Sequence, residues 1–131
     1  MNIQKVALIG AGGIGSYLIW GLSSLLKENF VVIADGKRGE KLRENGIIIN
    51  GEPYRLHVKT ADDAGKVDLI FVTIKYGGLP QILPLLQQLT GENTIIISLM
   101  NGVDSEEIIA EAVGKDHLVG SLLRIAAQRT V

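Results

Sequence analysis

The chain has 131 residues, of which 47% are hydrophobic and 21% charged, and this balance is typical of one globular domain. A formal net charge of −1 gives no long-range attraction to nucleic acid or to an anionic membrane, so neither partner is expected. The sequence contains no cysteine, which excludes disulfides, thiolate metal sites and a thiol nucleophile. The first apolar run, residues 6–9, is too short for a signal peptide or a membrane span, and we expect a cytoplasmic protein.

The first part of the chain alternates between strand and helix patterns. Apolar, β-branched runs predict strands over "KVALIG" (5–10) and "FVVIAD" (30–35). A polar stretch, "KRGEKLRENG" (37–46), predicts a short helix that stops at its final glycine. A longer helix is expected between the two strands, because four apolar residues fall near one helical face: Ile14, Leu18, Leu22 and Leu25.

The middle of the chain predicts a hairpin, a buried strand and a helix. The turn signal "NGEP" separates "GIII" from "YRLHV", so we expect a β-hairpin over 46–58. The continuous apolar run "VDLIFVTI" (67–74) is typical of a strand that is covered on both faces. Apolar residues at helical spacing follow over 82–89. Pro80 fits the first turn of that helix, whereas Pro84 indicates a late start or a kink.

The last part repeats the alternation. A buried strand is expected over "NTIIISL" (93–99), and a further strand over "HLVGSLL" (117–123). Between them, "DSEEIIAEAVG" predicts a helix with Asp104 or Ser105 as N-cap and Gly114 at its end. Regular alternation of this kind predicts an α/β fold, with a mostly parallel sheet, helices on both faces and a small β-hairpin insertion.

Glycines cluster where the first strand meets the first helix, in the pattern Gly10-x-Gly12-x-x-Gly15. The first glycine permits a tight turn, the second lets a pyrophosphate approach the backbone, and the third lets the helix lie close to the strand. Free N–H groups at the helix start then face the phosphates. This is the fingerprint of a Rossmann-type doubly wound domain; the alternative is a glycine-rich turn that binds nothing. The residues expected to hold the diphosphate are Gly10, Ala11, Gly12, Gly13, Ile14 and Gly15.

The end of the second strand bears on the choice of cofactor. Asp35 lies about 20 residues beyond the fingerprint, where an acid accepts hydrogen bonds from the adenosine ribose and favours NAD. Lys37 and Arg38 follow at once, and either could reach the 2′-phosphate of NADP. These two side chains could equally be a solvated helix start. The sequence therefore predicts NAD or NADP without choosing between them.

Two polar residues follow the next two buried strands. Lys75 comes after "FVTI" and Asn101 after "ISLM". Both residues are expected at the ligand-binding edge, because ligands of open parallel sheets bind outside the carboxyl ends of the strands. A lysine there can pair with phosphate or ribose oxygens, and an asparagine can donate and accept near the nicotinamide. The alternatives are a solvated strand-end lysine and an Asn-Gly turn.

The motifs "GAGGIGSY", "IADGKRGEKLRENGI", "VTIKYGGL", "SLMNGVDSEEII" and "VGSLLRIAA" together resemble the N-terminal domain of the ketopantoate reductase (2-dehydropantoate 2-reductase) family over essentially the whole chain. The resemblance implies a cytosolic oxidoreductase of pantothenate synthesis. Such an enzyme passes a hydride from NADPH to the ketone of 2-dehydropantoate, a small 2-oxo acid, and gives pantoate.

The resemblance also implies roles for particular residues. Lys75 and Asn101 would contact the ribose-nicotinamide side of the cofactor, Asn101 would border the substrate, and the backbone of Ala126 would meet the cofactor. This chain has Asp35 where family members often have arginine, and Arg124 departs from the usual small or aromatic residue. The general-acid lysine of the family belongs to a helical C-terminal domain. Residues 1–131 would then be the dinucleotide-binding domain alone, without a catalytic residue and inactive or nearly so by itself.

Other interpretations of the chain stay open. A free-standing NAD-sensing regulatory domain has the same fingerprint and acid at a similar length, and a related reductase could act on a different 2-oxo acid. A domain without its partner would expose an apolar face, so a homodimer is a further hypothesis. Trp20 is expected to lie between the first helix and the sheet or against the absent domain. His57, in the hairpin, and His117 are expected to be surface residues with no metal-ligand spacing.

Overall fold

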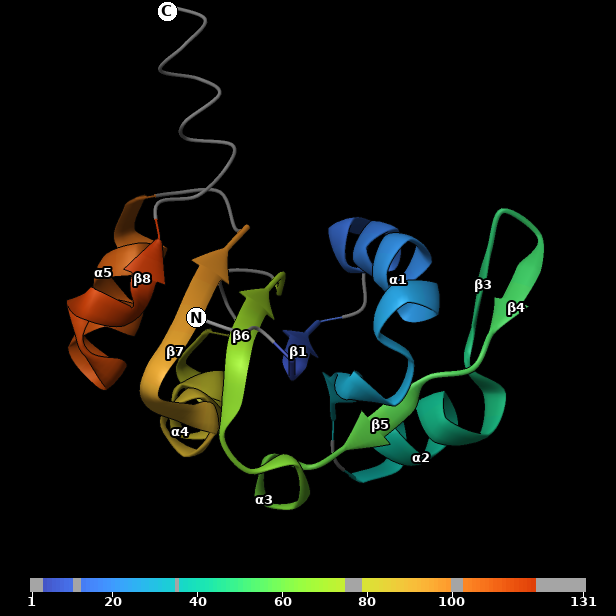
Figure 1. The fold of residues 1–131 in the computed structure, drawn as a ribbon, viewed down its shortest axis with the longest axis horizontal. Helices are drawn as coiled ribbons and strands as arrows, with labels where there is room; N and C mark the ends of the chain where they lie inside the picture. Colours follow the sequence, from blue (N-terminus) through green and yellow to red (C-terminus); the bar gives the residue numbers. More distant parts are fainter. Residues whose placement is uncertain (1–3, 11–12, 35, 75–78, 100–102, 120–131) are drawn as a thin grey trace, which may run out of the picture.

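A parallel sheet forms the centre of the molecule (Figure 1). The structure is a computed structural model that describes residues 4–10, 13–34, 36–74, 79–99 and 103–119. Within these residues the sheet has six strands in the order β5-β2-β1-β6-β7-β8, and all adjacent pairs are parallel. The strands are β1 (Val6–Ile9), β2 (Phe30–Ile33), β5 (His57–Lys59), β6 (Val67–Val72), β7 (Thr90–Ser98) and β8 (Leu118–Val119).

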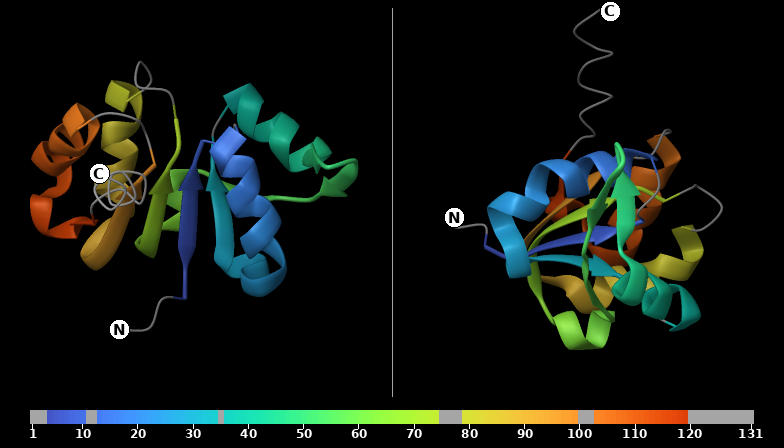
Figure 2. Two further views of the ribbon diagram at one scale, coloured as in Figure 1. Left: turned by 90° about the horizontal axis from the view of Figure 1, so that it is seen from above. Right: turned by 90° about the vertical axis from the view of Figure 1, so that its right-hand side faces the viewer.

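The helices cover both faces of this sheet, as predicted (Figure 2). Helix α1 lies on one face, whereas α3 and α4 lie on the other. The chain starts at β1, winds outward to β2 and β5, and then returns to the centre at β6, so the winding direction reverses between β1 and β6. This is the doubly wound topology, and its carboxyl-end crevice lies at that reversal. The helices are α1 (Gly13–Leu26), α2 (Gly36–Asn45), α3 (Ala61–Ala64), α4 (Leu79–Leu89) and α5 (Val103–Val113), with 3-10 turns η1 (Lys27–Asn29) and η3 (Lys115–His117).

Two hydrophobic clusters hold the helices to the sheet. All four residues of β1 and all four of β2 are buried. Their side chains alternate between the two faces of the sheet, and helices cover both faces. Ile9 and Ile33 belong to the cluster under α3, α4 and α5, where Leu86 of α4 is fully buried. Leu8 and Val32 belong to the cluster under α1. Among the described helices, none is long and apolar enough to pass through a membrane.

The predicted hairpin is present but shorter than expected. Strands β3 (Ile47–Ile49) and β4 (Glu52–Tyr54) pair antiparallel and form a separate two-stranded sheet. The expected second arm, "YRLHV", is divided, because its last residues leave the hairpin and extend the main sheet as β5. His57 therefore lies in β5, opposite Val31, and the prediction that it lies in the hairpin is wrong. Burial of Val58 under the α1 face provides the reason.

Helix α1 buries a face that overlaps only in part with the predicted one: Leu18 and Leu22 contact the core cluster as predicted, but Leu25 does not. Ile19 is fully buried, whereas Leu25 is 76% exposed. Leu26 also contacts the cluster on this face of the sheet. Trp20 is 56% exposed, so it does not lie between the helix and the sheet, and its alternative place against a second domain stays a prediction.

Two later helices begin earlier than the sequence suggested. Helix α4 begins at Leu79 and contains Pro84 in its interior, so a late start is wrong, while Pro80 lies in the first turn as predicted. Helix α5 begins at Val103, which places Asp104 and Ser105 inside its first turn instead of at the N-cap.

Asp68 fixes the chain at the amino ends of the two central strands. Its carboxylate accepts hydrogen bonds from the backbone N–H groups of Lys5 and Gln4, each at 2.9 Å. These bonds favour the charged form and therefore hold the pKa of Asp68 below its ordinary value. The bond from Lys5 has the larger effect. The contact ties the residues just before β1 to β6, the two strands between which the winding reverses.

Candidate functional site

The described residues on either side of the turn after β1 agree with the glycine pattern. Gly10 has φ +97°, a conformation that L side chains rarely adopt. A Cβ atom on Gly10 would lie 2.8 Å from Ile74 Cγ2 and 3.0 Å from the Thr73 carbonyl carbon. Three residues later the chain enters α1 at Gly13, with Ile14 and Gly15 in its first turn. The end of β1 and the start of α1 therefore follow one another at the spacing that the fingerprint requires.

A threonine that the sequence analysis did not single out fixes this turn. The hydroxyl of Thr73, just after β6, donates to the carbonyl oxygen of Gly10 and lies 3.2 Å from that of Ile9. Its backbone N–H donates to the Ile9 carbonyl at 2.9 Å. The end of β6 therefore holds the end of β1 at the position where the fingerprint turn begins.

Replacement of Thr73 by valine tests this anchor. Valine keeps the shape and removes the hydroxyl, so the Gly10 carbonyl loses its side-chain partner. We expect the free energy of unfolding to fall by about 1 kcal/mol, measured by urea denaturation. Thr73→Ser retains the hydroxyl and serves as the control, with stability near that of the parent chain. Equal stabilities of the valine and serine variants would contradict the anchoring role.

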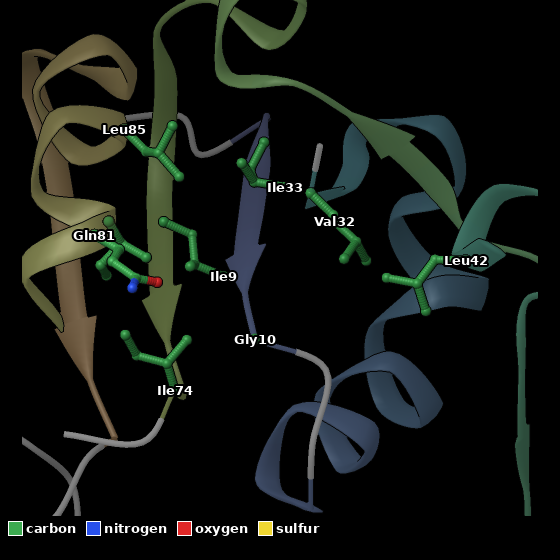
Figure 3. Close-up of a pocket in the computed structure, with 10 residues that line it drawn as sticks. Ile9, Gly10, Val32, Ile33, Leu42, Ile74, Gln81 and Leu85 are labelled. Atoms are coloured by element: carbon green, nitrogen blue, oxygen red, sulfur yellow. The ribbon is translucent and has the colours of Figure 1, made fainter. Parts of the chain in front are cut away.

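A cavity of about 370 Å³ opens beside this turn (Figure 3). Its volume falls within the roughly 300–1,000 Å³ range of small-molecule sites. It lies at the carboxyl ends of three strands, where Gly10, Ala34 and Ile74 follow β1, β2 and β6. Helix α4 forms one side of the cavity, and Leu42 of α2 lies across from it (Figure 3). The lining residues are Ile9, Gly10, Val32, Ile33, Ala34, Leu42, Ile74, Gln81, Ile82 and Leu85.

Several predicted site residues border this region in the chain but lie outside the described residues. Asp35 is flanked by Ala34, whose N–H donates to the Lys59 carbonyl at 3.1 Å, and by Gly36, the first residue of α2. The other predicted site residues that lie outside the described residues are Ala11, Gly12, Lys75, Asn101 and Ala126. Their proposed contacts with a cofactor or substrate stay predictions.

The two predicted phosphate-binding cations are on the first turn of α2. Lys37 is exposed, and Arg38 follows it in the same helix. The turn comes directly after the position of Asp35, at the carboxyl end of β2. Their assignment to the 2′-phosphate of NADP remains a prediction.

The histidines lie away from this crevice. His57 is exposed in β5. His117 is half-buried in η3, and its Nδ1 atom lies 2.8 Å from the carbonyl oxygen of Thr94 in β7. Hydrogen bonding to the backbone gives His117 a structural role. In the part of the chain that the structure describes, no group of three or more His, Asp or Glu side chains could hold a metal ion.

The topology, the glycine turn and the adjoining cavity define a Rossmann-like doubly wound domain. The sequence model of the ketopantoate reductase PanE/ApbA family matches residues 6–130. This chain therefore belongs to the ketopantoate reductase family, as its motifs suggested.

Individual relatives agree with this assignment. The chain is 32% identical over 115 residues to 2-dehydropantoate 2-reductase of Pyrococcus horikoshii, covering 86% of this chain and 38% of that protein. It is 26% identical over 123 residues to an uncharacterized oxidoreductase, YkpB, of Bacillus subtilis, covering 91% of this chain and 40% of that protein. The chain thus spans about two fifths of the length of the curated relatives that it matches.

Solved structures show the same fold. D-mandelate dehydrogenase in a ternary structure with NADH and anilino(oxo)acetate matches with a TM-score of 0.75 and 26% identity, over 88% of this chain and 39% of that one. 2-Dehydropantoate 2-reductase from Geobacter metallireducens matches with a TM-score of 0.71 and 27% identity, over 88% of this chain and 40% of that one.

Proposed function

We propose that this chain is the dinucleotide-binding domain of a cytoplasmic oxidoreductase that reduces 2-dehydropantoate, or a related 2-oxo acid, with NADPH or NADH. The observation that carries the proposal is the Gly10 turn, which leads from β1 into α1 at the point where the sheet reverses its winding. Family membership over residues 6–130 supports the reductase over a free-standing regulatory domain. Substrate-binding groups and the general acid would belong to a separate helical domain.

The residues present fit a dinucleotide. A Cβ at Gly10 would meet Ile74 and the Thr73 backbone, so the bare backbone there is a requirement of the turn. Amides at the start of α1 would hold the diphosphate, because the helix N-terminus attracts negative charge. Apart from Gln81, the described side chains that line the cavity are apolar, and such side chains suit the flat faces of an adenine base. When bound, the dinucleotide supplies the hydride, and the task of this domain is to hold and orient it.

The preference between the two dinucleotides is expected to be small. The Asp35 carboxylate would accept from the ribose 2′-hydroxyl and repel a 2′-phosphate, whereas Lys37 and Arg38 on α2 would attract one. These opposing effects lead us to expect affinities for NADH and NADPH within about tenfold of each other, or about 1.4 kcal/mol.

Calorimetric titration of the chain with NADH and with NADPH tests the proposal. We expect saturable binding of at least one of them at a single site, and no comparable binding of nicotinamide mononucleotide, which lacks the adenosine half. A folded chain that binds neither dinucleotide would overturn the proposal. Asp35→Asn should shift the ratio of affinities toward NADPH, because it removes the charge that opposes the 2′-phosphate.

A further inference from the structure

The wall of the cavity beside Gly10 includes a polar side chain, that of Gln81. Among the described residues that line it, Gln81 alone carries hydrogen-bonding groups on its side chain, and the others are apolar or glycine. It comes from the first turn of α4, and its amide extends toward the strand ends near Ile9 and Ile74 (Figure 3). Small-molecule sites commonly combine apolar walls with a few polar groups that fix orientation and specificity. Gln81 has the position for such a group.

The other glutamines of α4 are placed differently. Gln87 donates from its Nε2 atom to the carbonyl oxygen of Ala112 at 3.0 Å, and so joins α4 to α5. Gln88 is exposed and does not line the cavity. Neither of these amides faces the crevice at the carboxyl ends of the strands, so the amide of Gln81 differs from them in its surroundings and not only in its sequence position.

The bound adenosine is expected to lie in this cavity. In a doubly wound domain the diphosphate lies at the glycine turn, and the adenosine ribose at the end of the second strand. The cavity extends between these two points, because its lining includes both Gly10 and Ala34. A base placed there has Ile33 and Leu85 as apolar neighbours and Gln81 near its polar edge.

We propose that Gln81 recognises the edge of the adenine base, which makes it a specificity-determining residue of the dinucleotide site. Its amide oxygen accepts a hydrogen bond from the 6-amino group, and its amide nitrogen donates to the adjacent ring nitrogen. Glutamine and asparagine amides match the adjacent donor and acceptor of adenine in this way. The inference rests on the proposed function, since it names a contact within that dinucleotide site.

A two-by-two comparison of variants and ligands tests the contact. The parent chain and Gln81→Met are titrated with NADH and with its analogue in which unsubstituted purine replaces adenine. Methionine keeps the length and apolar stem of the side chain but has no amide. The parent chain should bind the purine analogue about three- to tenfold more weakly than NADH, the range for one neutral hydrogen bond. Gln81→Met should bind both ligands equally, and Gln88→Met should behave like the parent chain.

The outcomes separate this inference from the proposed function. If the parent chain binds neither ligand, the proposed function and the role of Gln81 both fail. If it binds NADH, but Gln81→Met keeps the parent's preference for adenine over purine, the proposed function stands and the role of Gln81 is overturned. Gln81 is exposed, so the variants should melt at the temperature of the parent chain. Gln81→Ala repeats the comparison with a second side chain that lacks the amide.

Discussion

Replacement of Gly10 by alanine is expected to reduce dinucleotide affinity by about 100-fold or more, corresponding to about 2.7 kcal/mol. The backbone at Gly10 has φ +97°, which strains any L side chain. The new Cβ would also lie 3.0 Å from the Thr73 carbonyl carbon and 3.1 Å from the Ile74 backbone nitrogen. Because these neighbours are backbone atoms at the end of β6, rotation of a side chain cannot relieve the contact. The turn must move instead.

Movement of this turn affects both parts of the proposed site. The start of α1 would shift relative to β1, so its amides would no longer meet the diphosphate in the same geometry. Ile74, whose Cγ2 atom would lie 2.8 Å from the added Cβ, also lines the cavity proposed for the base. The measurement is calorimetric titration with NADH and NADPH, and thermal melting shows whether the variant is folded.

Gly21→Ala is the matched control for this substitution. Gly21 lies in the interior of α1 and is exposed, and outside its own helix no atom of the described residues lies within 4 Å of an added Cβ. Alanine there should leave the affinity unchanged and stabilise the fold by roughly 0.5–1 kcal/mol, because alanine favours the helix. A folded Gly10→Ala variant with the affinity of the parent chain would show that the turn does not form the site.

The sheet was predictable because buried strands have a strong sequence pattern. The continuous apolar runs that became β1, β2, β6 and β7 can only be buried between two layers, and right-handed crossovers then restrict their order. Strand β5 was not recognised for the opposite reason. It has three residues, of which Val58 alone is buried, and only its pairing with β2 distinguishes it from a hairpin arm.

The orientation of α1 could not be predicted from its apolar pattern. The sequence "GIGSYLIWGLSSLL" is apolar around most of the helix, so more than one face satisfies the helical period. Contact with β1 and β2 selects the face of Ile19, and Leu25 is left in solvent. Among the predicted site residues, the glycines have a recognisable spacing, and at Gly10 the backbone conformation favours glycine. Thr73 and Gln81 are single polar residues with no such spacing, and only the fold brings them to the crevice.

Gly46→Ala is expected to destabilise the fold by roughly 2–4 kcal/mol, which combines left-handed backbone strain with overpacking. Gly46 ends α2 with φ +63°, and its N–H donates to the Leu42 carbonyl at 2.9 Å. An added Cβ would lie 2.0 Å from the carbonyl oxygen of Tyr54. That atom belongs to strand β4, so the clash is relieved only by separating the hairpin from the end of the helix.

Gly51→Ala separates the two contributions to this loss. Gly51 also has a positive φ, +81°, but apart from its chain neighbours no atom of the described residues lies within 4 Å of its added Cβ, so only the backbone strain of roughly 1–2 kcal/mol applies. Thermal and urea denaturation of both variants should therefore show a clearly larger loss for Gly46→Ala. Equal losses would mean that Tyr54 does not approach Gly46 closely. Since the hairpin does not line the cavity, the folded fraction of either variant should bind dinucleotide like the parent chain, in contrast to Gly10→Ala.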